Sequence, residues 1–435
     1  SVGSQLSDTD RRNVALVTKQ YRKVSAIPAD RFEKFMVACS RGEHVWQEAK
    51  ATSDFGMFLP CLEEIIAFEK EFVEYEGYEQ NRYDALLDDY EPSMTTGELQ
   101  GIIDGLKQEL VPFIRKLQVE GTRPDTSFLA GTFPVSEQAQ LSRDVLTAMT
   151  YDFDAGRIDE TEHPFTTSLG AGDVRVTTHY YEHDLMSALF STMHEGGHGL
   201  YEQGISEEYH WMPLHRAASM GVHESQSRTW ENLVGRSEAF WRLYYPRLQG
   251  RFSQFRDVPV EDFYKAINVV EPSLIRIEAD EVTYNLHIML RFEIEEALIN
   301  GRVQAADLPG FWNAKMKEYL GVEPPDDAHG VMQDVHWAGG MFGYFPSYML
   351  GNLYAAQFFE AAREAIPKLD EELAAGHLSV LREWQRSNIH ACGALYDPKD
   401  LLVKVTGKPL DYHPFMQQVR AKYGRIYGIA EKQQG

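Results

Sequence analysis

Two histidines and a glutamate in one short stretch have the residue types and the spacing of a catalytic metal site. The stretch is His194-Glu195-Gly196-Gly197-His198, which fits the pattern H-E-x-x-H. Residues four apart on an α-helix lie on the same face, so His194 and His198 can offer two imidazoles to one metal ion. Glu195 lies beside them and can take a proton from a metal-bound water. The alternative is a polar helix face that binds nothing.

The residues around this stretch favour the metal site over an exposed face. They predict a mostly buried helix from Leu185 to about Gln203, and a buried histidine pair needs polar partners. Gly196 and Gly197 each cost a helix interior about 1 kcal/mol relative to alanine. We interpret this cost as a sign that a neighbouring element or a substrate passes close to the backbone. The apolar flanking residues are Leu185, Met186, Leu189, Phe190, Met193, Leu200 and Tyr201.

A third metal ligand is expected because a catalytic zinc usually has three protein ligands and one open position. The glutamates that follow His198 are the candidates. Glu224 is modestly favoured over Glu231 as the third ligand, because it lies near the start of the next predicted helix, which can cross the first. Glu202 is four residues beyond His198 and is interpreted as a partner of a ligand or as a structural residue. The candidates are Glu202, Glu207, Glu208, Glu224, Glu231 and Glu238.

The elements that must position these residues are predicted to be mostly helices. Apolar residues recur at helical spacing, for example over 219–234 and 275–299, and such stripes indicate core packing. Residues 164–180 instead predict a β-hairpin that leads into the H-E-x-x-H helix. The edge of this hairpin either pairs with an extended peptide or is purely structural. Residues 330–351 are rich in glycine and aromatic residues and predict a functional loop that enters a helix.

The sequence shows no clear domain boundary. We therefore expect a single catalytic domain over residues 1–435, with an N-terminal helical part at about 1–150 and a metal-site part at about 151–435. A chain of 435 residues is long enough for a large core.

Composition excludes several classes of partner. Lys and Arg total 42 against 66 for Asp and Glu, which gives a net charge of −24 and argues against nucleic acid. No apolar run is long enough to predict a membrane span. The three cysteines, Cys39, Cys61 and Cys392, are widely separated and predict no disulfide framework, which favours a reducing cytoplasm.

Several separated motifs make the chain similar to the Taq-type metallocarboxypeptidases over almost its whole length. Members of this family usually carry an additional N-terminal helical segment, which we do not find in this sequence. The matching motifs are D-x-R-x-T at 173–177, H-E-x-x-H at 194–198, H-E-S-Q at 223–226, I-R-x-x-A-D at 275–280 and G-x-x-Q-D-x-H-W at 330–337.

The resemblance implies a fold class, an activity and a ligand set. The expected fold is mostly α, a large helical bundle-like zincin with a deep groove and a small β-hairpin or sheet beside the H-E-x-x-H helix. The expected activity is metal-dependent removal of C-terminal amino acids from peptides. The resemblance also implies His194, His198 and Glu224 as ligands of one Zn²⁺ per chain, Glu195 as general base, and a homodimer. Co²⁺ or Mn²⁺ can occupy the same ligands.

Further residues are expected to bind substrate. The resemblance implies that Arg276 holds the C-terminal carboxylate of the peptide, since an arginine fork pairs with a carboxylate through two hydrogen bonds. The alternative is a structural ion pair with Glu278, Asp280 or another acid. His336 and Tyr348 are predicted to stabilise the oxyanion. Tyr344 and Arg175 are further candidates for substrate contacts. Asp334 and His223 are interpreted as residues that orient ligands. Asp173 and Arg175 can alternatively shape the hairpin edge without touching substrate.

Two rival functions stay open at this point. The first is a peptidyl-dipeptidase or oligo-endopeptidase of similar helical fold. The second is a non-catalytic metal-binding scaffold, which the intact Glu195 argues against.

Overall fold

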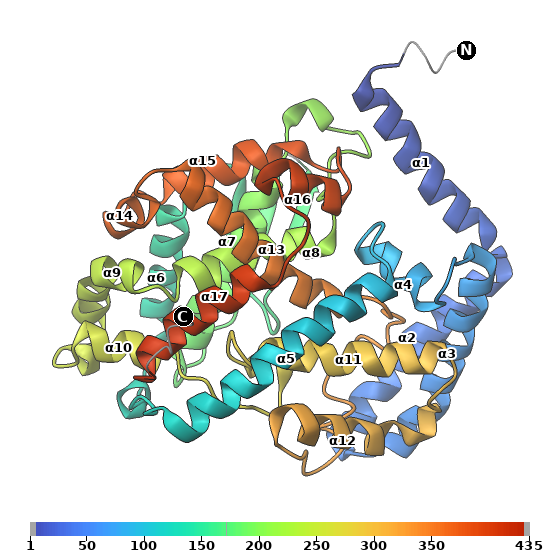
Figure 1. Ribbon diagram of the computed structural model, residues 1–435, viewed down its shortest axis with the longest axis horizontal. Coiled ribbons are helices and arrows are strands. Elements are labelled where there is room, and N and C mark those ends of the chain that lie inside the picture. Colours follow the sequence, from blue (N-terminus) through green and yellow to red (C-terminus); the bar gives the residue numbers. More distant parts are fainter. Residues whose placement is uncertain (1–5, 171, 430–435) are drawn as a thin grey trace, which may run out of the picture. The chain divides into compact units, whose positions relative to one another are not determined.

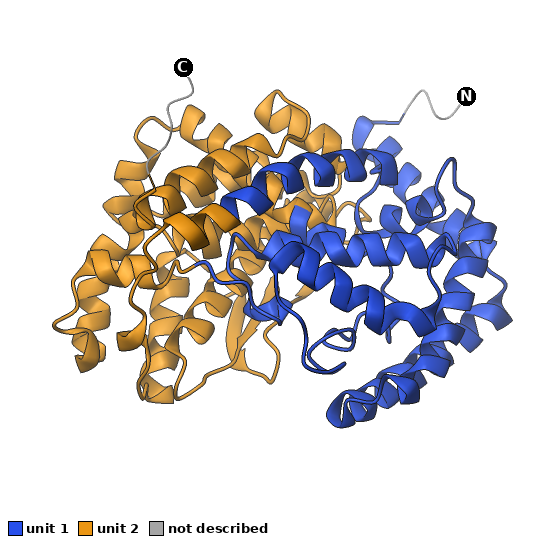
Figure 2. Ribbon diagram, turned by 60° about the horizontal axis from the view of Figure 1, so that its bottom comes forward, with its two compact units in different colours: residues 1–114, 270–349 blue, residues 115–269, 350–435 orange. Residues whose placement is uncertain are grey.

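The computed structural model describes residues 6–170 and 172–429, which form two compact units. Unit 1 comprises residues 1–114 and 270–349, and unit 2 comprises residues 115–269 and 350–435 (Figure 2). Each unit is therefore built from two separate stretches of the chain. Helices dominate both units, and the described residues contain one small sheet (Figure 1). The expected mostly helical fold with a small sheet is confirmed.

The described part of unit 1 contains helices joined by loops and no strand. Its second helix packs against its third, and Asp54 caps the third by accepting a hydrogen bond from the backbone N–H of Met57. The helices that lie wholly in unit 1 are α1 (Asp8–Ala26), α2 (Ala29–Thr52), α3 (Phe55–Glu76), α4 (Tyr83–Tyr90), α11 (Tyr284–Ile299) and α12 (Leu308–Leu320). Helices α5 (Thr96–Glu120) and α13 (Pro346–Ala365) contribute residues to both units.

Unit 2 is built around the H-E-x-x-H helix, α7 (Leu185–Gly204), as predicted. Its apolar core joins α7 to α6 and α9 through side chains such as Leu189, Met193 and Trp241. The other helices of unit 2 are α6 (Val135–Ala148), α8 (Met220–Arg228), α9 (Glu238–Arg251), α10 (Val260–Ala266), α14 (Leu369–Ala374), α15 (Ser379–Asn388), α16 (Pro398–Thr406) and α17 (His413–Ile426).

The sheet lies beside α7 and has the strand order β1-β3-β2. Strands β2 (Thr166–Gly170) and β3 (Asp173–Thr178) are antiparallel, so the predicted hairpin is confirmed. Strand β1 (Gly156–Glu160) pairs with β3 in parallel and was not predicted from the sequence. Val174 and Val176 of β3 are buried, so this strand carries the apolar face of the sheet.

One predicted helix begins later than expected. The periodicity predicts a helix over 275–299, but α11 starts at Tyr284, and Arg276–Glu278 form a 3₁₀ turn. The side chain of Asp280 accepts hydrogen bonds from the backbone N–H (3.0 Å) and the hydroxyl (2.7 Å) of Thr283. A side chain that bonds the backbone in this way favours a helix start over a helix interior.

The predicted loop over 330–351 is confirmed up to Pro346, where α13 begins.

None of the helices among residues 6–170 and 172–429 is both long enough and apolar enough to cross a bilayer.

Candidate metal centre

Helix α7 presents His194 and His198 on one face. Asp184 caps the helix by accepting a hydrogen bond from the backbone N–H of Ser187, which fixes where the helix begins. The apolar side of α7 is buried in the core of unit 2, which leaves the histidines on the opposite side. Their ring centroids are 4.8 Å apart. The predicted spacing therefore does bring both imidazoles together.

Helix α8 brings Glu224 to the two histidines. Ser219 caps this helix by accepting a hydrogen bond from Val222. The two helices cross where α7 has Gly197: a Cβ atom there would lie 2.6 Å from the carbonyl oxygen of Gln226. The glycine is needed because any larger residue would push the helices apart.

Two other glycines allow close packing around the same centre. A Cβ atom at Gly196 would lie 2.5 Å from the side chain of Leu146 on α6. A Cβ atom at Gly351 on α13 would lie 2.4 Å from Cγ of Glu224. The expectation that something passes close to the paired glycines of α7 is thus confirmed, and at both positions it is a neighbouring helix.

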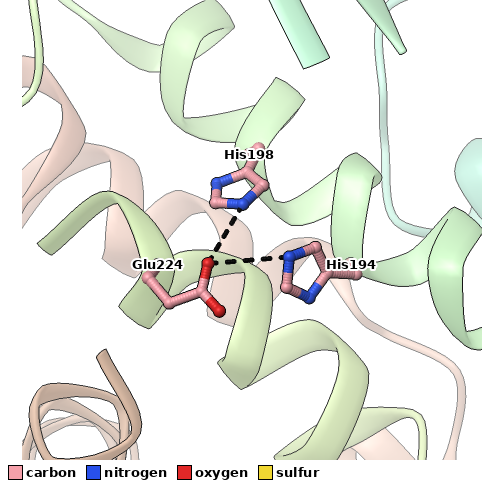
Figure 3. A group of neighbouring side chains, drawn as sticks. All are labelled: His194, His198 and Glu224. Carbon is pink, nitrogen blue, oxygen red and sulfur yellow. Dashed lines mark ion pairs between the residues drawn. The ribbon is translucent and has the colours of Figure 1, made fainter. Parts of the chain in front are cut away.

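The three side chains converge on one point (Figure 3). Oε2 of Glu224 lies 3.6 Å from Nε2 of His194 and 3.3 Å from Nε2 of His198. One ligand atom from each residue lies within 4.8 Å of the others. This is the one such group of three or more metal-binding side chains among the described residues. Two imidazoles and a carboxylate suit a divalent metal of the zinc type.

Glu231 and Arg228 surround this centre. A π-helical turn, Thr229–Val234, follows α8 directly, so the predicted helix over 219–234 changes its geometry half-way. Oε2 of Glu231 lies 2.8 Å from Nδ1 of His194. Arg228 donates from Nε to Oε1 of Glu224 (2.6 Å) and from Nη1 to Oε2 of Glu231 (3.2 Å). Glu231 therefore orients His194, and Arg228, which binds Oε1 of Glu224, leaves Oε2 to face the histidines.

The charges shift the pKa values of these groups strongly. Burial opposes ionisation of Glu224, but Arg228 and the two histidines outweigh it and hold its pKa well below the usual range. Burial opposes ionisation of Glu231 too, yet Arg228 and His194 lower its pKa to about 2. Burial alone would lower the pKa of His194, whereas Glu224 and Glu231 together raise it. Burial and the neighbouring His223 lower the pKa of His198 to about 3. Both carboxylates are thus ionised at neutral pH and attract a cation.

Glu195 lies next to the centre and is 7% exposed. The hydroxyl of Thr166 on β2 donates to Oε2 of Glu195 at 2.7 Å, which holds the carboxylate in place. Burial raises the pKa of Glu195 and outweighs both the charge of His194 and this hydrogen bond. A carboxylate with a raised pKa is suited to accepting and returning a proton.

A second charged cluster lies in unit 1 and contains Arg276. Its Nε and Nη2 donate to Oδ1 of Asp334 at 3.0 and 2.9 Å. Arg291 donates to Oδ2 of the same aspartate at 2.8 Å from Nε, and its side chain is 0% exposed. Nη1 of Arg276 also donates to the hydroxyl of Tyr284 at 2.9 Å. Arg276 and Asp334, singled out separately in the sequence, are thus directly paired.

The remaining predicted residues lie in both units. In unit 1, Nε2 of His336 lies 3.2 Å from the hydroxyl of Tyr348, and the rings of Tyr344 and Tyr348 are in contact with centroids 5.1 Å apart. The guanidinium of Arg276 lies 4.8 Å from the ring centroid of Tyr348. In unit 2, Arg175 is half-exposed on β3 and pairs with Asp173 of the same strand.

Three residues of these sites were not predicted, and for two of them the sequence carries a signal. Arg228 is four residues beyond Glu224, a spacing at which two side chains of a helix meet. Arg291 stands between the apolar residues Ile288-Met289-Leu290 and Phe292, and a charge in such a run requires a buried partner. Thr166 carries no such signal, because only the packing of β2 on α7 brings it to Glu195.

Comparisons with known proteins match this chain to metallopeptidases over almost its whole length. Residues 2–423 match the family described as Carboxypeptidase Taq (M32) metallopeptidase. The chain is 44% identical over 423 residues to Carboxypeptidase 1 of Bacillus subtilis, covering 97% of this chain and 84% of that protein. It is 46% identical to Thermostable carboxypeptidase 1 of Thermus thermophilus, over 96% of this chain and 83% of the relative.

A solved structure gives the same result. The M32 carboxypeptidase from Deinococcus radiodurans R1 superposes with a TM-score of 0.95 at 38% identity, covering 97% of this chain and 85% of that one. The resemblance seen in the sequence motifs is confirmed, and neither rival function is supported by these matches. The chain belongs to the Taq-type M32 metallopeptidase family and is a metal-dependent carboxypeptidase.

Proposed function

We propose that His194, His198 and Glu224 hold one divalent cation per chain and that this cation is zinc. The convergence of their three ligand atoms within 4.8 Å carries the proposal. Nδ1 of His194 lies 2.8 Å from Oε2 of Glu231, whereas Nε2 lies 3.6 Å from Oε2 of Glu224, so a single proton is better placed on Nδ1 and Nε2 keeps its lone pair. Two such acceptors repel unless a cation or a proton lies between them. Two nitrogens and one oxygen favour zinc, with cobalt and manganese as the alternatives.

Glu195 is the proposed general base. When bound, the cation would polarise the scissile carbonyl and lower the pKa of the attacking water. Glu195 takes the proton of this water and returns it to the leaving amine. Its place beside His194 and the hydrogen bond from Thr166 support this role, because they keep the carboxylate in one orientation while it gains and loses the proton.

Arg276 is the proposed anchor for the C-terminal carboxylate of the peptide. Arg276 and Arg291 share the single carboxylate of Asp334, so the cluster carries one uncompensated positive charge in a buried setting. A substrate carboxylate would neutralise that charge. His336 and Tyr348 are the proposed oxyanion donors, and Tyr344 and Arg175 are proposed to contact substrate. The family resemblance is the support for these four assignments.

Oligomeric state and compartment stay predictions. The homodimer is expected from the resemblance. The cytoplasmic location is supported by Cys39, Cys61 and Cys392, all of which are free thiols in the structure.

Metal removal tests the cation. Dialysis against a chelator should abolish release of C-terminal amino acids from a peptide, and one equivalent of Zn²⁺ should restore it. Restoration by Mn²⁺ or Co²⁺ but not by Zn²⁺ would contradict zinc as the native metal. A His194→Ala variant should bind no stoichiometric metal, and retention of metal by this variant would contradict the ligand set.

A pair of peptides tests the anchor. The wild-type protein should cleave a peptide with a free C-terminal carboxylate. It should leave the same peptide with an amidated C-terminus nearly uncleaved. In Arg276→Met, Asp334 keeps Arg291 as its partner, so the unit should stay folded while the preference for the free acid falls. Arg157→Met is the matched control, since Arg157 forms an exposed ion pair with Asp159. An unchanged ratio of kcat/KM for the two peptides in Arg276→Met would refute the anchor.

A further inference from the structure

The two metal-binding histidines of unit 2 have different partners behind them. Nδ1 of His194 meets the carboxylate of Glu231 directly, at 2.8 Å. Nδ1 of His198 instead meets a second imidazole, Nδ1 of His223, at 2.5 Å. Nε2 of His223 then lies 2.9 Å from Oε1 of Glu202. His198 therefore reaches a carboxylate only through another histidine.

The positions of these residues follow from the two crossing helices. His198 and Glu202 are four apart on α7, so they lie on the same face. His223 precedes Glu224 on α8 and fills the space between them. Side chains of His223 and Glu202 are each 15% exposed.

The protons in this arrangement can be assigned from the acceptors. The ionised carboxylate of Glu202 only accepts, so Nε2 of His223 carries a proton. A neutral His223 then has a lone pair at Nδ1, and the proton in the contact of 2.5 Å belongs to Nδ1 of His198. Nε2 of His198 is left without a proton, and this is the atom that faces Oε2 of Glu224 at 3.3 Å.

We propose that Glu202 and His223 are positioning residues that hold His198 in the tautomer able to bind the metal. This inference rests on the proposed metal site and adds a function to two residues outside the ligand set. Without the lone pair of His223, the proton of His198 moves to Nε2, where Oε2 of Glu224 can accept it. That form of His198 cannot bind a cation until it loses the proton again.

The first test reads the tautomer of His198 by ¹⁵N NMR in the metal-free full-length protein. The wild-type protein should show His198 protonated at Nδ1. His223→Phe keeps a ring in place but removes both nitrogens, and His198 should then shift to protonation at Nε2. An unchanged His198 tautomer in His223→Phe would overturn the proposal.

A matched control separates positioning from packing. The rings of His223 and His390 both lie against Tyr201, with centroids 5.1 and 5.0 Å away, but His390 bonds Gln226 rather than a metal ligand. His390→Phe should leave the His198 tautomer as in the wild type. An equal change of tautomer in both variants would overturn the proposal, since general repacking would then explain it.

The second test measures the zinc Kd by competition with a chelator. We expect His223→Phe to weaken zinc binding about 10- to 100-fold, the usual effect of removing a partner of a metal ligand. Glu202→Gln keeps an acceptor oxygen but loses the charge, and it should weaken binding less. Zinc affinity within about threefold of the wild type in both variants would overturn the proposal.

The two proposals fail in different ways. If the wild-type protein binds no stoichiometric zinc while the tautomer still depends on His223, the metal assignment is wrong and the positioning role stands. If zinc binds at the wild-type site and the tautomer of His198 does not depend on His223, the positioning role is wrong and the metal site stands.

Discussion

Two buried charged clusters, one in each unit, differ in what their atoms face. In unit 1, Arg276 and Arg291 point their N–H groups at the two oxygens of Asp334, so donors meet acceptors. In unit 2, Nε2 of His194 and Nε2 of His198 lie 3.6 and 3.3 Å from one oxygen of Glu224, and in the proposed tautomers each nitrogen presents a lone pair to that oxygen. Donors and acceptors are matched in the first arrangement, whereas the second is proposed to hold a cation between its acceptors. The comparison indicates that the direction of donors and lone pairs distinguishes an arginine–carboxylate cluster from a candidate ligand set better than the number of charges does.

The largest expected effect lies in unit 2 and concerns activity alone. Glu195→Gln removes the proposed base but none of the ligands, so kcat should fall by about 10²- to 10⁴-fold. Metal content, measured by elemental analysis, should equal that of the wild type. Activity within tenfold of the wild type would show that another group takes the proton.

The next effect lies in unit 1 and concerns stability. Asp334→Ala leaves two buried guanidinium groups without their carboxylate and should cost about 3–5 kcal/mol in the free energy of unfolding. Asp173→Ala is the control, because Asp173 forms a comparable but half-exposed pair with Arg175 and its loss should change stability far less. Urea titration measures both. Equal losses of unfolding free energy in the two variants would mean that burial does not increase the contribution of the Asp334 cluster to stability.

Gly197→Ala tests whether close helix crossing holds the ligand set together. The added Cβ would lie 2.6 Å from the carbonyl oxygen of Gln226, so α8 must move away from α7. We expect a loss of about 1–3 kcal/mol in stability, together with weaker zinc binding. At Gly250 on α9 a Cβ meets nothing within 4 Å, so Gly250→Ala should be neutral or stabilising. Unchanged zinc affinity in Gly197→Ala would show that the crossing tolerates a wider separation.

The smallest effect is a pH dependence in unit 1. Burial lowers the pKa of His336 from 6.5 to about 4, so this residue is neutral at physiological pH and acts as a neutral hydrogen-bonding group. A depressed pKa contributes stability above the unfolded-state value, and this contribution is lost as the pH falls from 6.5 towards 4. NMR titration of His336 should show no transition between pH 5.5 and pH 8. A midpoint near 6.5 would contradict this assignment.

Local spacing determined much of the metal centre. The four-residue spacing of His194 and His198, with apolar residues on both sides, predicted α7 and the orientation of its two imidazoles. Residues four apart on a helix lie on the same face. The same logic predicted the hairpin of β2 and β3 from alternating residues around a glycine turn. It failed at 275–283, where the side chain of Asp280 accepts hydrogen bonds from the backbone and the helix begins only at Tyr284.

Tertiary structure decided the rest. Spacing left Glu224 and Glu231 almost level as ligands, and only the crossing at Gly197 and the π-helical turn place one at the centre and the other behind His194. The contact of Thr166 with Glu195 and the joining of Arg276 and Arg291 through Asp334 link residues far apart in the chain. Sequence spacing encodes neighbours within one helix or hairpin, whereas contacts between elements depend on how side chains of many residues pack together.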